Sequence, residues 1–390
     1  MSNAGLSTWV SYPPCTKRIY QIECYNVGFG DCFLCKDDRE NGAKMLVDCG
    51  THRAFKNVAV TGDIYSKLIN AQEKNLMISH LHQDHYNGIT YLLKSHPNLK
   101  FDNVYLPNYI SNGSLELYAA MVFYGKKDDS LSKIARTVLA IPGILASNLS
   151  RYAKIYFACE GEIIHNQLCS FETILPKKSL NLPHFINNEQ IRAFCEDYRK
   201  ILNVNVSDSE YTITADQITQ DNHIQQRIDD LIREYDMVEF PPILDDKLEV
   251  LGKAFEHHHN NMSLAFHEKS VCDNHNVLFL GDAEKANIKY ACNKYARKYY
   301  NFVKIPHHGT KAHFYNYLPS AKYYAITNGD LHKSWEITSQ YDTQYGKNAT
   351  FICSNNVNCE ICQRGGTCQS HTINGAICGI KLNSIIVDII

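Results

Sequence analysis

The sequence predicts a layered α/β protein, and three features of the 390-residue chain support that class. Residues 18–48 contain short apolar runs separated by Gly and Asp, a pattern typical of a β-meander. Residues 62–109 alternate between strand-like and helix-like periodicity, and the alternation resumes after residue 257. Such alternation favours sheets covered by helices over an all-β or all-α fold.

The expected elements follow in order along the first half of the chain. Three strands form the meander, joined by the turns GFGD and DDRENG: RIYQIECYNV, CFLCK and KMLVDCG. Ile64, Leu68 and Ile69 have helical spacing in GDIYSKLINAQ, and a buried strand is expected in NLMISH. A helix in NGITYLLKSH and a strand in FDNVYLPNY come next. Residues 113–150 are expected to be helical, and strands return in AKIYFAC and SFETILP.

Residues 178–256 break this rhythm and are expected to form a helical insertion. Three segments have helical periodicity and follow residues that can cap a helix: NNEQIRAFCEDYRKIL, TADQITQDNHIQQRIDDLIREY and LDDKLEVLGKAFEH. The predicted organisation is therefore a first half-domain in residues 1–177, the insertion, and a second half-domain in residues 257–390. An insertion of this size offers a surface for a protein partner.

The second half returns to alternating strands and helices. Expected strands are MSLAFHE, NVLFLGD, FVKIPHHG, YYAITNG and ATFICSN, and expected helices are AEKANIKYACNKYARKYY, AHFYNYLP and WEITSQYDTQYG. The segment KYARKYYNFVK mixes basic and aromatic residues. It fits either a helix that tracks a single nucleic-acid strand or an amphipathic surface helix.

Composition limits the classes of function. The formal net charge of −2 gives no global positive field, so a nucleic-acid partner requires a local basic groove. No window approaches the roughly 18 consecutive apolar residues of a membrane span. The first residues lack a basic region followed by an apolar stretch, so no signal peptide is predicted. We therefore expect a soluble cytoplasmic protein with no membrane partner.

The segment SHLHQDHYNG, residues 79–88, concentrates potential metal ligands directly after an apolar strand. Alternate side chains of an extended loop point the same way, so His80 and His82 can converge on one cation. A turn at Gln83 then directs Asp84 and His85 toward a second position. Nitrogen-rich ligation with one carboxylate suits zinc, manganese or iron rather than calcium or magnesium. A polar surface loop with histidines by chance explains this density poorly.

Two distant segments carry further candidate ligands. NVLFLGDAEK is an apolar strand that ends in Gly281 and Asp282, where sites in layered α/β proteins collect. Asp282 as a simple helix N-cap is the alternative. FVKIPHHGTK is a second strand, ending in His307 and His308. Together with the first cluster, in this order along the chain, they indicate one composite metal site.

These motifs resemble those of metallo-β-lactamase-fold hydrolases, in which H-x-H-x-D-H is followed by a strand ending in G-D and a strand ending in histidine. More closely, the chain resembles the soluble metallo-hydrolase domain of the competence protein ComEC and its stand-alone relatives, through NVGFGDCFL, MLVDCG, NNMSLAF, FLGDA and IPHHGT. The resemblance covers residues 18–176 and 257–357. It implies a four-layer αββα fold and a hydrolase with two metals at its active site.

The resemblance also implies a role for each residue of the site. His80 and His82 would bind one metal, Asp84 and His85 the second, and Asp282 would bridge both.

Four other residues belong to the same implied site. Of His307 and His308, one would complete the second metal site and the other would contact substrate or orient a ligand. Asp48 would orient the histidine loop rather than bind metal. The fold often has one more histidine, four residues before the Ser or Gly that opens the strand preceding G-D, and counting back from Ser263 gives His259. Alternatively, His259 only complements the C-terminal dipole of a helix.

The ligand set indicates hydrolysis assisted by two divalent transition metals, Zn²⁺ or Mn²⁺. Two cations that share a water lower its pKa toward neutrality, so a metal-bridging hydroxide can attack the substrate. The favoured function is a phosphodiesterase, either a nuclease or a hydrolase of a small nucleotide or cyclic nucleotide. Thr310 and Lys311 could donate to phosphate oxygens, or they belong to a solvated turn. The alternatives are a hydrolase of a lactone, thioester or amide, and a metal-containing interaction module recruited through the insertion.

Residues 353–371 are expected to hold a separate structural zinc in a knuckle-like loop. Cys359 and Cys362 have the C-x-x-C spacing that lets two thiolates reach one zinc, and Cys368 follows a Gly-containing loop. The fourth ligand would be Cys353 or His371. A disulfide or free thiols are the alternative, and a reducing compartment disfavours the former.

Overall fold

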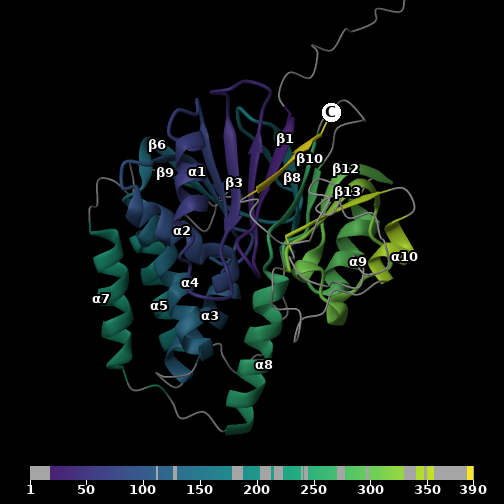
Figure 1. The fold of residues 1–390 in the computed structure, drawn as a ribbon. Coiled ribbons are helices and arrows are strands. Elements are labelled where there is room, and N and C mark those ends of the chain that lie inside the picture. The colour runs from purple at the N-terminus through teal and green to yellow at the C-terminus, as the bar shows by residue number, and fades with distance from the viewer. Residues whose placement is uncertain are drawn as a thin grey trace, which may run out of the picture.

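The protein is a mixed α/β structure with two β-sheets, which confirms the predicted class (Figure 1). The computed structural model describes residues 18–110, 113–125, 130–177, 188–202, 212–214, 223–238, 240, 245–269, 277–295, 298–328, 340–346, 349–354 and 384–389. None of the described helices is long and apolar enough to cross a lipid bilayer. Cys359, Cys362, Cys368 and His371, the core of the expected zinc loop, lie outside the described residues.

The first sheet has the strand order β15-β1-β2-β3-β4-β5-β6-β9. Its strands are β1 (Gln21–Tyr25), β2 (Cys32–Lys36), β3 (Lys44–Cys49), β4 (Lys74–Met77), β5 (Phe101–Pro107), β6 (Leu149–Ala158), β9 (Thr212–Thr214) and β15 (Ser384–Asp388). The expected meander is present, because β1, β2 and β3 pair antiparallel. From β3 to β6 the pairing is parallel. β15 pairs antiparallel with β1 and was not expected from the sequence.

The second sheet has the order β14-β13-β12-β11-β10-β8-β7. Its strands are β7 (Ile163–His165), β8 (Ser170–Leu175), β10 (Ala265–Glu268), β11 (Val277–Phe279), β12 (Tyr299–Lys304), β13 (Ser320–Ile326) and β14 (Thr350–Cys353). β11 to β14 pair in parallel, so their carboxyl ends meet at one edge. Because β8 belongs to the first half of the sequence, this sheet joins both halves of the chain.

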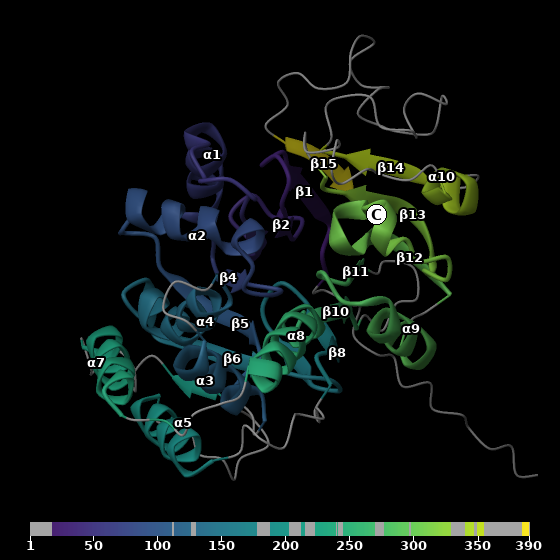
Figure 2. The same ribbon diagram turned by 90° about the horizontal axis from the view of Figure 1, so that it is seen from below.

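The helices lie on both sides of the strands (Figure 2). On the side of the first sheet lie α1 (Val58–Leu68), α2 (Gln83–Ser95), α3 (Ser114–Tyr124) and α4 (Ser130–Ala146). Three further helices pack against α3 and α4: α5 (Glu189–Ile201), α7 (Ile224–Asp236) and α8 (Asp245–Asn261). The second sheet is covered by α9 (Lys285–Lys294) and α10 (Gln340–Tyr345). Two short 3₁₀ turns, η2 (Pro306–Gly309) and η3 (Lys311–His313), follow β12.

Two sheet faces pack against each other through aromatic side chains. The ring of Phe33 on β2 lies 5.4 Å from that of Phe279 on β11, and Phe279 stacks on Phe266 of β10 at 4.9 Å. All three side chains belong to one buried apolar cluster with members from both sheets. Burial of this shared face, worth roughly 25 cal/mol per Å² of apolar surface removed from water, fixes the two sheets relative to each other.

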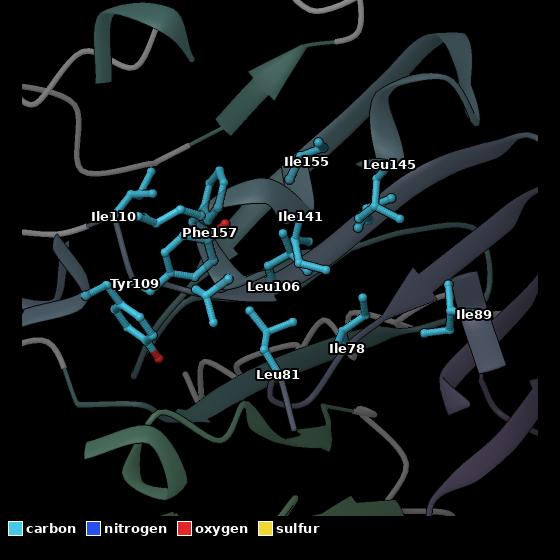
Figure 3. Close-up of a cluster of buried hydrophobic side chains, with 14 of the residues drawn as sticks. Ile78, Leu81, Ile89, Leu106, Tyr109, Ile110, Ile141, Leu145, Ile155 and Phe157 are labelled. Atoms are coloured by element: carbon cyan, nitrogen blue, oxygen red, sulfur yellow. The ribbon is translucent and has the colours of Figure 1, made fainter. Parts of the chain in front are cut away.

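A second core lies between the first sheet and its helices (Figure 3). Ile78, Leu106 and Ile155 from the sheet side meet Ile141 and Leu145 of α4 in this cluster. The described helices of the region 178–256 belong to it as well, because α5, α7 and α8 bury side chains in the same cluster: Phe194, Cys195, Tyr198, Ile228, Leu251 and Phe255. The helical character expected for this region is thus present, and its helices share their core with α3 and α4.

Three sequence expectations fail in detail. The first is the helix expected over AHFYNYLP, because only the short turn η3 forms at its start and residues 314–319 are not helical. The helix expected over AEKANIKYACNKYARKYY ends at Lys294, and Tyr299–Lys304 form strand β12 between β11 and β13. Tyr300 and Phe302 are fully buried, so neither a helix that tracks nucleic acid nor an amphipathic surface helix occurs there. The helix expected from Thr214 is also wrong at its start, because Thr212–Thr214 pair with β6 and α7 begins at Ile224.

We predict that Gly50→Ala destabilises the protein and that Gly62→Ala does not. A Cβ at Gly50 would lie 2.5 Å from the Asp84 carbonyl carbon and the His85 nitrogen, so the start of α2 would have to move. Overpacking of this kind costs about 1–3 kcal/mol. A Cβ at Gly62, inside α1, meets nothing within 4 Å, and alanine there should stabilise by about 0.5–1 kcal/mol. Urea unfolding of both variants in EDTA measures the difference, and equal stabilities would contradict this account of Gly50.

Candidate metal centre

The histidine segment connects β4 to α2, and its course explains why His80 and His82 face the same way. The side chain of Leu81, between them, is buried in the apolar cluster of Figure 3. Alternation along the chain therefore sends His80 and His82 to the opposite side. His82 is extended and serves as the N-cap residue of α2. Asp84 and His85 lie in the first turn of that helix rather than in a free loop, so the helix fixes their direction.

Asp282, His307 and His308 come from the second sheet and reach the same place. Asp282 follows β11, after Gly281 in a left-handed conformation with φ of 53°. A Cβ at Gly281 would lie 2.9 Å from the Ser263 Cβ, so glycine permits this close approach. His307 and His308 follow β12 with φ of 49° and 56°, which is uncommon for residues other than glycine. The carboxyl ends of parallel strands thus assemble the centre.

Four side chains form what we call the second group: Asp84, His85, Asp282 and His308. The Nε2 atom of His308 lies 3.1 Å from Asp84 Oδ2 and 3.2 Å from Asp282 Oδ2. The Nε2 atom of His85 lies 3.6 Å from Asp282 Oδ2 and 3.9 Å from Asp84 Oδ1. Ligands held 2.0–2.2 Å from a tetrahedral zinc are about 3.3–3.6 Å apart, and the four distances here lie around that range, from 3.1 to 3.9 Å. Asp31, His85, Asp282 and His308 also have one ligand atom each within 4.8 Å of one another, as a shared cation would require.

Two carboxylates lie behind these histidines. Asp48 Oδ2 is 2.9 Å from His85 Nδ1, and Asp48 also accepts from the backbone N–H and hydroxyl of Ser79 at 2.6 Å. Asp31 Oδ1 is 3.1 Å from His308 Nδ1. Since both carboxylates contact Nδ1, they leave the Nε2 atoms of His85 and His308 directed at the centre. The orienting role expected for Asp48 requires such a contact, and the structure adds Asp31, whose segment NVGFGDCFL contributed to the family resemblance without a role being assigned to Asp31.

Lys304 is the second residue that sequence reasoning missed. Its ammonium is buried, 2.5 Å from Asp31 Oδ2 and 3.0 Å from Asp282 Oδ1, and it donates to the Gly281 carbonyl. The Asp282 Oδ1 atom also accepts the His307 backbone N–H at 3.1 Å. Asp282 therefore has Oδ2 alone directed toward His85 and His308. A lysine inside the apolar pattern of FVKIPHH gives no sequence signal of this contact.

His80, His82 and His259 form what we call the first group. His80 Nε2 lies 3.0 Å from His82 Nδ1, and the ring of His259 lies 4.3 Å from the ring of His82. His259 is buried at the end of α8, and its Nδ1 is hydrogen-bonded to the hydroxyl of Tyr118 at 2.9 Å. The structure thus brings His259 into the centre from a helix end. Tyr118 is a further residue that the sequence did not single out.

Buried nitrogen atoms without partners mark both groups. The Nε2 atoms of His85 and His259 are buried and have no hydrogen-bond partner among the described residues. An unsatisfied buried polar atom costs about 1–3 kcal/mol, so it calls for an explanation. Coordination of a cation by these nitrogens would provide that explanation.

The two groups differ in their electrostatics. Burial lowers the pKa of His80, His82 and His259, so these rings are neutral at pH 7. At His85 burial acts in the same direction, but nearby carboxylates raise the pKa to about 10, and they raise that of His308 as well. Neutral imidazole is the form that binds metal.

The centre opens into a cleft of about 620 Å³. Its inner wall carries Asp84, Asp282, His307 and His308, and its outer wall carries residues of α4: Ser130, Lys133, Ile134 and Thr137. Phe29 and Tyr86 add aromatic surface, and Thr310 also lines it. Lys311, the other residue expected to meet phosphate, begins η3 and is exposed.

Comparisons with known proteins add little to this geometry. No family model matches the chain, and no curated protein matches it significantly. Among solved structures, the long form RNase Z from yeast is similar with a TM-score of 0.31 and 13% sequence identity. The match covers 97% of this chain and 42% of the RNase Z chain, so the chain spans less than half the length of that protein.

We predict that Lys304→Met lowers the free energy of unfolding by about 3–5 kcal/mol, because it leaves Asp31 and Asp282 buried without their cation. The double variant Lys304→Met/Asp31→Asn should recover part of that loss. Urea unfolding in EDTA measures both. Lys253→Met, which breaks an exposed ion pair with Glu249 on α8, is the control and should have no measurable effect. A double variant no more stable than Lys304→Met would contradict the network.

The two groups should also differ in the pH dependence of cation binding. A cation at the second group must displace protons from His85 and His308, whose pKa values are raised, so its affinity should rise about tenfold per pH unit for each proton displaced between pH 6 and 8. The first group is already neutral there, so its affinity should stay constant. Calorimetric Mn²⁺ titrations in buffers of different ionisation enthalpy measure proton release for each equivalent. Equal proton release by both equivalents would contradict the assignment.

Proposed function

We propose that the protein is a hydrolase dependent on two divalent transition-metal ions, Zn²⁺ or Mn²⁺, and that its substrate contains a phosphodiester. The observation that carries this proposal is the second group, in which the Nε2 atoms of His85 and His308 lie 3.1 to 3.9 Å from carboxylate oxygens of Asp84 and Asp282. The motif resemblance supports assignment to the metallo-β-lactamase fold and its ComEC-like branch.

The first group would hold one cation and the second group the other. Asp282 lies where it can serve both, because its Oδ2 faces the second group and it belongs to the same cleft as His82. The pair of cations would supply an activated water at neutral pH and offset negative charge on the attacked centre. Asp48 and Asp31 would hold the histidine rings in the tautomer that leaves Nε2 for the cation.

Charge favours an anionic substrate. Lys304 already neutralises part of the charge of Asp31 and Asp282. Two divalent cations would therefore leave the inner wall of the cleft net positive toward a bound group. Lys133 on α4 adds a cation on the opposite wall. A phosphodiester carries the charge that such a cleft attracts, whereas a neutral lactone or amide gains nothing from it.

The size and shape of the cleft favour a single strand or a small nucleotide. Phe29 and Tyr86 provide aromatic surface on which a base can stack. The net charge of −2 provides no extended positive track for a duplex. The proposal of a nuclease therefore applies to single strands or strand ends, and that of a cyclic-nucleotide or nucleotide hydrolase stands beside it.

We predict turnover of bis(p-nitrophenyl) phosphate by the wild-type protein with added Zn²⁺ or Mn²⁺. Asp84→Ala should abolish this turnover, because the second group loses the carboxylate that lies beside the Nε2 atoms of both His85 and His308. Asp48→Asn should lower kcat/KM by about 10- to 100-fold through the orientation of His85. Glu249→Gln, on the exposed face of α8, is the control and should leave turnover unchanged.

Two results would overturn the proposal. Absence of phosphodiester turnover with either metal, with lactone, thioester or amide substrates cleaved instead, would retain the metal centre and reject the substrate. Full metal binding with no hydrolysis of any of these substrates would favour a metal-containing interaction module.

A further inference from the structure

A third set of candidate ligands lies beside the two groups already described. Glu284 precedes α9, His307 belongs to η2 and His313 ends η3. One ligand atom from each of the three lies within 4.8 Å of one from each of the others. We call this set the outer cluster.

His307 has turned away from the second group. Its Nδ1 is 3.7 Å from Asp282 Oδ2, whereas the adjacent His308 places Nε2 3.2 Å from the same atom. Instead, the ring of His307 stacks on that of His313, with centroids 3.8 Å apart and planes 14° from parallel. The left-handed backbone at both residues thus gives two consecutive histidines different neighbours.

The Nε2 atom of His307 is buried and has no hydrogen-bond partner among the described residues. The side chain lines the cleft and is more than nine-tenths buried. Packing does not account for a polar ring nitrogen in that position, since it costs about 1–3 kcal/mol when unsatisfied. A cation coordinated by this nitrogen would remove that cost.

The other two members are held in place. His313 Nδ1 is hydrogen-bonded to the Thr310 hydroxyl at 2.9 Å, which leaves its Nε2 for a further contact. Glu284 Oε1 accepts from Asn260 Nδ2 at 3.2 Å, and Asn260 also lines the cleft. Two imidazoles and one carboxylate are a ligand set that binds zinc with an open coordination position.

We propose that Glu284, His307 and His313 form a third cation site, for one divalent transition metal such as Zn²⁺ or Mn²⁺. His307 and His313 line the cleft, and the site shares no residue with the first or second group. Because two of its ligands line the cleft, a cation held there would add positive charge for a second anionic group of a bound molecule. The site stands independently of the bond that the centre cleaves, because cation binding alone reveals it.

The test compares cation equivalents in full-length wild-type protein and two variants. The proteins are dialysed to equilibrium against Mn²⁺ and, separately, against Zn²⁺, and bound metal is then quantified. Glu284→Gln and His313→Ala should each bind about one equivalent less than wild type with at least one of the two cations. A structural zinc in residues 353–371 contributes equally to wild type and variants, so it cancels in the difference.

Two controls separate this site from the proposed function. His52→Ala removes a histidine that lines the same cleft outside the three sets, and it should bind as much metal as wild type. Asp84→Ala should lose the equivalent of the second group while retaining that of the outer cluster. Failure of the proposed function would therefore leave the difference between His313→Ala and His52→Ala intact.

The proposal is overturned if Glu284→Gln and His313→Ala both bind as much Mn²⁺ and Zn²⁺ as wild type. His313 is only partly buried and Glu284→Gln is isosteric, so both variants should fold. Thermal unfolding of each in EDTA checks this.

Discussion

The buried ion network of Asp31, Lys304 and Asp282 is the interaction on which the rest of the centre depends. Asp31 belongs to the loop before β2 in the first sheet, whereas Lys304 and Asp282 belong to the second sheet. Each buried charge costs several kcal/mol unless it is paired, so the network forms only when the two sheets are docked. The backbone of Asp31 also donates to Asp84 O and accepts from Gly50 N. One residue therefore fixes β3, α2 and the second sheet relative to each other.

The carboxylates of this network also act on the histidines of the second group. In the second group, His85 and His308 carry raised pKa values because carboxylates surround them. Their protons provide the positive charge that a cation would provide. Cation binding at the second group would therefore exchange these protons for the charge of the cation. The first group, with neutral rings beside Tyr118, has no comparable exchange.

Local pattern was enough to predict part of this structure. The spacing of His80, His82, Asp84 and His85 is a property of one short segment, and strand ends at Asp282 and His308 are visible as apolar runs followed by polar residues.

What sequence missed depends on tertiary pairing. Lys304 reads as one polar letter in an apolar strand, yet contact with Asp31, 273 positions away, determines its role. For the same reason Tyr299–Lys304 read as the end of a helix, because basic and aromatic letters with helical spacing also suit a strand paired on both sides. Strand β15 could not be anticipated either, since its pairing with β1 joins the two ends of the chain.

The helices act on a different property of the centre from the sheets. The sheets carry the buried ion network of the centre. α4 lines the cleft, and α8 positions His259 directly and Glu284 through Asn260. α8 ends with His259, beside His82, and with Asn260, which holds Glu284. Its inner face is anchored by Phe255, whose ring packs against Tyr118 of α3. A shift of α8 along that contact would move His259 and Asn260, and with them one member of the first group and the support of Glu284, whereas no member of the second group lies on α8.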